Sequence, residues 1–493
     1  MRKKYSIKFW IIFWFLAVIM MVAWFLFLQY KNKNYARLLS IAKPVAQIMP
    51  ISTIKKSELM GSLDIVTELS KKEKNTFLLL FQNKDELRPG GGYIGSFGIL
   101  KIEKGKVTFV DTHDTNVFDS RVATQVDPPK PMKDWLGIKD LELRDSNWSP
   151  DFETNAKQAD YFYHLEGGQE DLDGVIALSS KLLPSFLEVV GPVQIEGYPG
   201  IYDSKNAVEQ LEYQVEKGYY DQGVEKGKRK YIMKEMSKAI IKKAQSLSLA
   251  KKKELFKRVE QHLNEKDVLI YFKDDIIQQK VKKLGWSGEV KSVKNSDFIM
   301  MVDANLGARK SDALIDRSFE YTVDFRQKKP VAELKIKYTH KGKVRDLLTD
   351  DYRTYLRVLV PSKSWLTSTE GLSGLDFVDF GNILGLKSFG IFHKVNLGKT
   401  KVITFRYFLP EEFNLDNYQL FIQKQAGIDK LIGKVKIIDK MGGIRTYTIN
   451  STKDVKLKID SRKLRKNKSK DIQTTQQKIN GTVAEVDIDN MNI

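Results

Sequence analysis

Residues 75–100, NTFLLLFQNKDELRPGGGYIGSFGIL, decide the fold of this chain. The apolar run at 75–81 is typical of a buried strand, and the glycines after it are typical of a tight turn. Residues 96–102 and 106–110 predict two further strands joined by a short hairpin. The glycines match G-x-G-x-x-G, but the next segment predicts a strand rather than a helix, which disfavours a dinucleotide site.

Outward from this stretch, the sequence predicts two folded units. Strands alternate with helices as far as residue 311, which predicts an α/β layered domain over residues 71–311. One of these helices is expected at 152–165, with Thr154 as its N-cap. Residues 312–450 hold short runs of partial alternation between turn signals, which predicts an all-β, sandwich-like domain. Residues 451–493 are expected to form a basic and polar tail.

The amino-acid composition excludes several kinds of site and suggests the charge of the partner. The chain has 493 residues and no cysteine, which excludes disulfides, thiolate metal sites and a cysteine nucleophile. Its 82 basic and 62 acidic residues give a formal net charge of +20. Such a charge favours anionic partners, namely nucleic acid, acidic lipid or acidic wall polymers. Nucleic acid is not expected, because the basic runs lack the interleaved aromatics of single-strand binding surfaces.

The N-terminal region predicts a membrane anchor. A basic segment at residues 1–8 precedes a long apolar run at 9–30. The run is long enough to cross a bilayer and longer than the apolar core of a cleaved signal peptide, the competing interpretation. We therefore expect a single-pass signal-anchor, a cytoplasmic N-terminus, a stalk at 31–70 and an extracytoplasmic body.

Two polar segments flank the predicted sheet. Arg88 stands beside the glycines and could hold an anion. The segment 110–119, VDTHDTNVFD, packs His113 and Asp114 among other acids and amides. Carboxylates beside a histidine can bind a divalent metal or act as a base, whereas the same residues can also cap the exit of a strand.

Two further segments suggest ligand binding. Residues 143–152, LRDSNWSPDF, gather Arg144, Asp145, Asn147 and Trp148, which would suit a sugar or, alternatively, a buried helix-entry turn. Near the start of a predicted helix lies the basic run 228–230, which includes Lys228 and Arg229. Cations near a helix N-terminus are repelled by the helix dipole, and a bound anionic ligand would offset that repulsion. Alternatively, the run is only a solvated charged surface.

Several stretches carry a family resemblance. LLLFQNKDELRPGGGYIGSFGIL, RDSNWSPDF, DGVIALSSKLLPSFLEVVGPV, DANLGARKSD and YQLFIQKQAG resemble the bacterial domain-of-unknown-function family DUF4012, over about residues 75–427. That resemblance implies an anchored cell-envelope protein, of a kind often encoded among genes for extracellular polysaccharide. It implies no biochemical activity.

The order of elements also resembles the LytR–CpsA–Psr phosphotransferases, which move a lipid-linked glycan onto the cell wall. In this resemblance Arg88, Asp114 and Thr115 match the motifs of those enzymes, whereas Gly90 and His113 replace an aspartate and an arginine. The resemblance implies a LytR–CpsA–Psr-like α/β fold. It also implies Mg²⁺ at Asp114, with Arg88, His113 and Asp114 as catalytic residues. The later arginine pair of those enzymes would fall near Lys228 and Arg229.

Two functions follow as hypotheses. The protein binds or transfers a polyprenyl-diphosphate-linked glycan or an acidic wall polymer, in which case phosphate chemistry would rely on cationic clamps. Alternatively it is a non-catalytic envelope scaffold or glycan-binding protein. The sequence leaves open whether it is an enzyme.

Overall fold

The computed structural model describes residues 53–459, except 105, 292–294 and 373–377. The predicted N-terminus (1–8), anchor (9–30) and most of the stalk and tail lie outside these residues. Within the described part of the chain, no helix combines the length and the apolar character that a membrane crossing requires.

The first unit is built on a five-stranded sheet of order β3-β2-β1-β4-β5. Its central strands β1 and β4 run parallel, and the other neighbours are antiparallel. The strands are β1 (Lys74–Asn83), β2 (Tyr93–Glu103), β3 (Lys106–Asp114), β4 (Gly174–Ser179) and β5 (Val268–Phe272). The helices are α3 (Thr53–Leu69), α4 (Thr115–Asp119), α5 (Lys130–Leu136), α6 (Phe152–Leu165), α7 (Leu182–Val190), α8 (Ala207–Tyr213), α9 (Tyr219–Asp221), α10 (Tyr231–Gln245), α11 (Leu249–Asn264) and α12 (Asp275–Leu284).

Alternation along β1 creates the layers of this unit. Leu78 and Leu80 pack into one core with residues of α6, whereas Phe77 and Leu79 pack into another with residues of α3, α11 and α12. Successive side chains of a strand point to opposite faces, so the apolar run at 75–81 serves both cores. Helices therefore cover both faces of the sheet.

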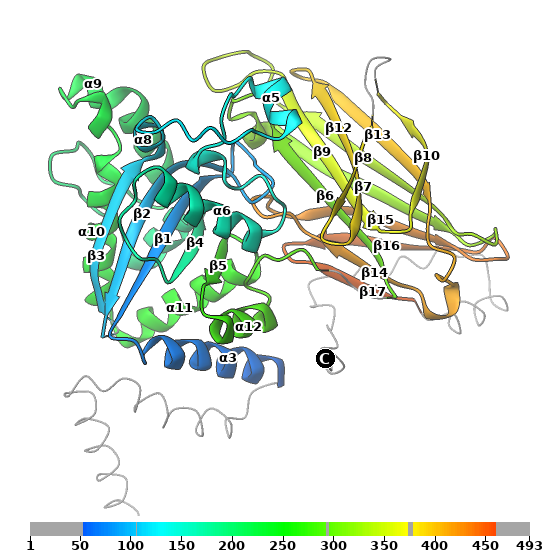
Figure 1. Cartoon of the computed structure of the whole chain (residues 1–493), viewed down its shortest axis with the longest axis horizontal. Coiled ribbons are helices and arrows are strands. Elements are labelled where there is room, and N and C mark those ends of the chain that lie inside the picture. The colour runs from blue at the N-terminus through cyan, green and yellow to red at the C-terminus, as the bar shows by residue number, and fades with distance from the viewer. Residues whose placement is uncertain (1–52, 105, 292–294, 373–377, 460–493) are drawn as a thin grey trace, which may run out of the picture.

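The second unit contains two six-stranded sheets, of order β10-β13-β8-β7-β15-β16 and β11-β12-β9-β6-β14-β17. Residues from both sheets share one apolar core, so the sheets pack face to face. Figure 1 shows this unit beside the first. Its strands are β6 (Asp297–Asn305), β7 (Ile315–Asp324), β8 (Val331–His340), β9 (Tyr352–Pro361), β10 (Trp365–Glu370), β11 (Asp379–Ile383), β12 (Leu386–Val395), β13 (Thr400–Phe408), β14 (Gln419–Gln423), β15 (Leu431–Ile438), β16 (Ile444–Ser451) and β17 (Val455–Lys458).

The observed boundaries differ from the predicted ones. β6 was expected inside the α/β domain, yet it pairs with β9 and β14 in the second unit. A buried apolar strand looks alike in either unit, so its pattern does not reveal its sheet. Helix α3 falls within the predicted stalk, yet Ile65 is buried in the core beside α12, so α3 belongs to the first unit. β17 pairs with β14 and extends the second unit past residue 450.

Candidate functional site

The glycine loop between β1 and β2 lies at the junction of the two units. Gly90 donates its backbone N–H to the carbonyl of Asn147, 3.0 Å away. A Cβ at Gly90 would overlap the side-chain amide nitrogen of Asn155. From the second unit, Gly427 approaches so closely that a Cβ there would overlap the carbonyl of Gly91. The glycines thus allow close packing of backbone against backbone.

Arg88 points into this junction. Its side chain is 4% exposed and donates to the backbone carbonyl of Asn305 in β6 and to the carboxylate of Glu86, at 2.8 Å in the second case. The Gln425 side-chain amide donates to the carbonyl of Arg88 at 3.1 Å. Arg88 therefore joins the two units, and its hydrogen-bond partners are Glu86 and backbone carbonyls rather than Asp114.

Asn147 and Trp148 complete the junction. The amide of Asn147 donates to the carbonyl of Gly92 at 2.6 Å. The Trp148 ring lies 4.8 Å from the Arg357 guanidinium and 6.0 Å from the Tyr355 ring, both on β9. These contacts agree with a buried helix-entry turn rather than a sugar site, because both side chains are engaged within the protein.

The end of β3 carries the charged group of the candidate site. Asp114 is the N-cap of α4 and accepts from the backbone N–H of Asn116 at 3.0 Å. Its carboxylate contacts Lys230 at 2.8 Å and Arg229 at 3.2 Å. Burial alone would raise the pKa of Asp114, but the two cations and the hydrogen bonds outweigh it and lower that pKa.

Arg144 extends the group from the other side. Its guanidinium donates to the side-chain oxygen of Asn116 at 2.7 Å, and Tyr93 donates to the same oxygen at 3.2 Å. It also pairs with Glu142. Arg144, Arg229 and Lys230 therefore surround the Asp114–Asn116 turn. We call these three residues, with Asp114 and Asn116, the β3-end cluster.

His113 faces the other side of β3. Its ring stacks on Phe97 with centroids 4.9 Å apart, and its Nε2 lies 3.8 Å from the Asp111 carboxylate. Burial lowers the pKa of His113, so the imidazole is neutral at pH 7. The alternation of strand side chains separates His113 from its neighbour Asp114.

Asp145 borders the cluster, because its carboxylate lies 3.9 Å from the Arg144 guanidinium, whereas Lys228 stands apart from it. Asp145 is buried, and burial raises its pKa to about 6 against the opposing charges of Arg88 and Arg144. Lys228 has a side chain that is 69% exposed and pairs with Glu225 at 2.9 Å. Of the predicted site residues, the structure thus brings together Asp114, Arg229 and Arg144, with Asp145 beside Arg144. It leaves Arg88, His113, Asn147, Trp148 and Lys228 elsewhere.

The donor set around Asp114 does not fit Mg²⁺. One carboxylate oxygen faces the Lys230 ammonium and the other faces the Arg229 guanidinium. In residues 53–459, apart from the three internal gaps, no three His, Asp or Glu side chains are grouped to hold a metal ion. We therefore assign no metal step to this group.

Two features escaped the sequence analysis. Lys230, the nearest cation to Asp114, belongs to the basic run at 228–230 but was not distinguished within it. The buried carboxyl groups of Asp119 and Glu166 contact each other, and burial together with Glu166 raises the pKa of Asp119 to about 9. No local signal connects these two residues, because one ends α4 and the other follows α6.

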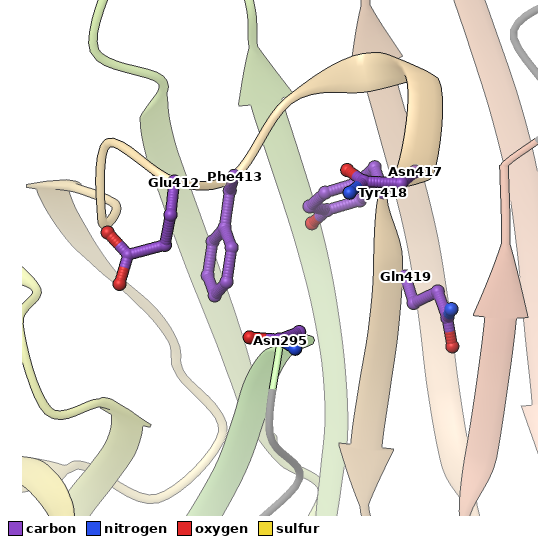
Figure 2. A pocket seen from close by; sticks show the side chains of 6 residues that line it. All are labelled: Asn295, Glu412, Phe413, Asn417, Tyr418 and Gln419. Carbon is purple, nitrogen blue, oxygen red and sulfur yellow. The ribbon is translucent and has the colours of Figure 1, made fainter.

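A separate cavity of about 280 Å³ lies in the second unit. Figure 2 shows Phe413 extending from the loop before β14 toward Asn295. None of the predicted site residues lines this cavity. Its lining residues are Asn295, Glu412, Phe413, Asn417, Tyr418 and Gln419.

The fold defines a mixed α/β unit joined to a two-sheet β unit. Residues 72–215, which include the glycine loop and the end of β3, match the family described as "Protein of unknown function (DUF4012)". This match supports the assignment of that part of the chain to the family. No curated protein matches the chain significantly.

Solved structures show only distant likeness. The Lin1025 protein from Listeria innocua is 11% identical with a TM-score of 0.26, over 46% of this chain and 86% of that one. A putative nutrient binding protein from Legionella pneumophila is 10% identical with a TM-score of 0.18, over 25% and 50% of the two chains. An M1 zinc metallopeptidase from Deinococcus radiodurans is 8% identical with a TM-score of 0.14, over 28% and 38%. Such low scores carry no argument, and the LytR–CpsA–Psr resemblance stays a hypothesis.

Proposed function

We propose that this protein is an anchored envelope protein that binds the phosphate or diphosphate group of a lipid-linked or wall-attached glycan, and that it acts by binding rather than by group transfer. The observation that carries the proposal is the β3-end cluster. Three cationic side chains from two distant segments of the chain converge there on one short turn. Charged donors on a rigid frame are what a phosphate group requires.

The two arginines are the residues that reach a ligand. The Arg144 side chain is 29% exposed and the Arg229 side chain is 16% exposed, whereas Lys230 is buried. Lys230 donates to Asp114 and to the backbone carbonyl of Gly95, so it fixes the turn. Arg144 and Arg229 would contact the anion, and Lys230 would position Asp114.

The contacts of the predicted catalytic residues favour binding over group transfer. Asp114 has both oxygens engaged by cations, and Arg88 is engaged by the carbonyl of Asn305. Anchoring through residues 9–30 would hold the site close to lipid-linked substrates, and the net charge of +20 favours acidic wall polymers.

The test measures diphosphate binding to the full chain held in neutral-lipid nanodiscs. Arg144→Ala and Arg229→Ala should each weaken binding of inorganic diphosphate and of polyprenyl diphosphate about tenfold, which corresponds to about 1.4 kcal/mol. Lys205→Ala, an exposed lysine of the same unit, is the matched control and should change nothing. If neither arginine variant weakens binding in a folded protein, the proposal is wrong.

A further inference from the structure

A cavity of about 270 Å³ opens at the edge of the five-stranded sheet, on the side of β3 that His113 faces. None of the residues of the β3-end cluster lines this cavity. Strands β2 and β3, helices α4 and α6 and the loop before β4 all contribute to it. The lining residues are Phe97, Ile99, Asp111, His113, Phe118, Arg121, Tyr163, Gly167, Gly168, Gln169 and Glu170.

The base of this cavity is aromatic and fixed. The ring of Phe97 lies 4.8 Å from that of Phe118 and 6.0 Å from that of Tyr163. Phe118 and Tyr163 stack with centroids 5.8 Å apart. All three side chains are buried, and the His113 ring stacks on Phe97 as a partly exposed wall. Flat apolar walls of this kind accept the C–H face of a sugar ring.

The rim is polar and carries one uncompensated positive charge. Asp111 is paired with Lys234 at 2.7 Å, and Glu170 is paired with Lys101 at 2.6 Å. Both carboxylates keep an oxygen that can accept from a hydroxyl. Arg121 is exposed, its guanidinium lies 5.0 Å from the Phe118 ring, and no carboxylate of the described residues pairs with it.

We infer that this cavity binds one acidic sugar residue, a hexuronic acid unit of the glycan. The sugar ring would lie against His113 and the aromatic base, its hydroxyl groups would donate to Asp111 and Glu170, and its carboxylate would pair with Arg121. The volume suits one ring rather than a long oligosaccharide. This inference rests on the proposed function, because it names the sugar part of the same glycan.

The experiment titrates the full chain in detergent micelles with a glucuronate-containing trisaccharide and with its carboxyl-reduced counterpart. The acidic trisaccharide should bind at least tenfold more tightly than the reduced one, and Arg121→Gln should remove that preference. Arg326→Gln is the matched control, because Arg326 is also exposed but lies in the second unit, paired with Asp324. The trisaccharide should also shift the NMR signals of the His113 ring.

The two proposals fail in different ways. Both proposals stand if Arg121→Gln removes only the preference for the acidic trisaccharide, while Arg144→Ala and Arg229→Ala weaken diphosphate binding. The inference about the cavity is wrong if the two trisaccharides bind equally, or if Arg121→Gln keeps the preference for the acidic one. This holds regardless of the result for diphosphate binding. The proposed function alone fails if neither Arg144→Ala nor Arg229→Ala weakens diphosphate binding while Arg121→Gln still removes the preference for the acidic trisaccharide.

Discussion

The junction around Arg88 and the β3-end cluster use charge in opposite ways. At the junction, a buried arginine donates to a backbone carbonyl of the other unit, and glycines let the two backbones touch. At the β3-end cluster, Arg229 pairs with Asp114 and Arg144 donates to Asn116, and both arginines stay partly exposed to solvent. The comparison teaches that the most distinctive motif of this chain joins its two units, whereas the plainer polar segment at the end of β3 lies beside two arginines that stay partly exposed.

The largest expected effect comes from removing the junction arginine. Arg88→Ala should lower the free energy of unfolding by about 3–5 kcal/mol, because it leaves Glu86 and the Asn305 carbonyl without their buried partner. Urea unfolding of the full chain in detergent measures this loss. Lys84→Ala in the same loop should cost less than about 1 kcal/mol, because Lys84 pairs near the surface. Equal losses in the two variants would contradict the role given to Arg88.

A smaller effect is expected from the second unit's side of the junction. Gly427→Ala should cost about 2–3 kcal/mol, because a methyl group there meets the Gly91 carbonyl and the φ angle is +88°. Gly442→Ala is the matched control, with a φ of +82° and no atom within 4 Å of the added Cβ. The control carries only the backbone strain. The difference between the urea-unfolding midpoints of the two variants therefore measures the contact between residue 427 and the Gly91 carbonyl. No difference would mean that the two backbones do not touch.

The last effect is a dependence of stability on pH, and it concerns the buried carboxyl pair beside the β3-end cluster. Because the pKa of Asp119 is raised to about 9, the folded protein keeps a proton that the unfolded chain releases near pH 4. Stability should therefore fall as pH rises from about 4 to about 9, and Asp119→Asn should reduce that slope. Thermal unfolding at pH 5, 7 and 9 tests this. A slope that is the same in Asp119→Asn would contradict the prediction.

Local patterns predicted the helix and strand positions well where one segment determines its own structure. Helix α6 spans the predicted residues 152–165, but its N-cap is Asp151 rather than Thr154. Asp151 accepts from the backbone N–H of Thr154 at 2.9 Å and from that of Val290 at the same distance. The second contact comes from the link between the two units, which the local sequence does not reveal.

The candidate site was predictable in part for the same reason. Asp114 and Arg229 were placed together through a resemblance in the order of elements, and they lie 3.2 Å apart. Arg88 and Trp148 were expected to meet a ligand, but their partners Asn305 and Arg357 lie more than 200 positions along the chain. A sequence pattern describes neighbours along the chain, so it cannot show that a distant strand occupies a side chain.

The junction also has a consequence for folding. Arg88 and Gln425, which meet there, are 337 positions apart in the chain. During synthesis, the first unit emerges long before the segment that completes its junction. The glycine loop therefore lacks its contacts with the second unit until that segment has been made. Contacts of such long sequence separation form slowly, because the intervening chain must be ordered first. We expect docking of the two units to be the last and rate-limiting step of folding.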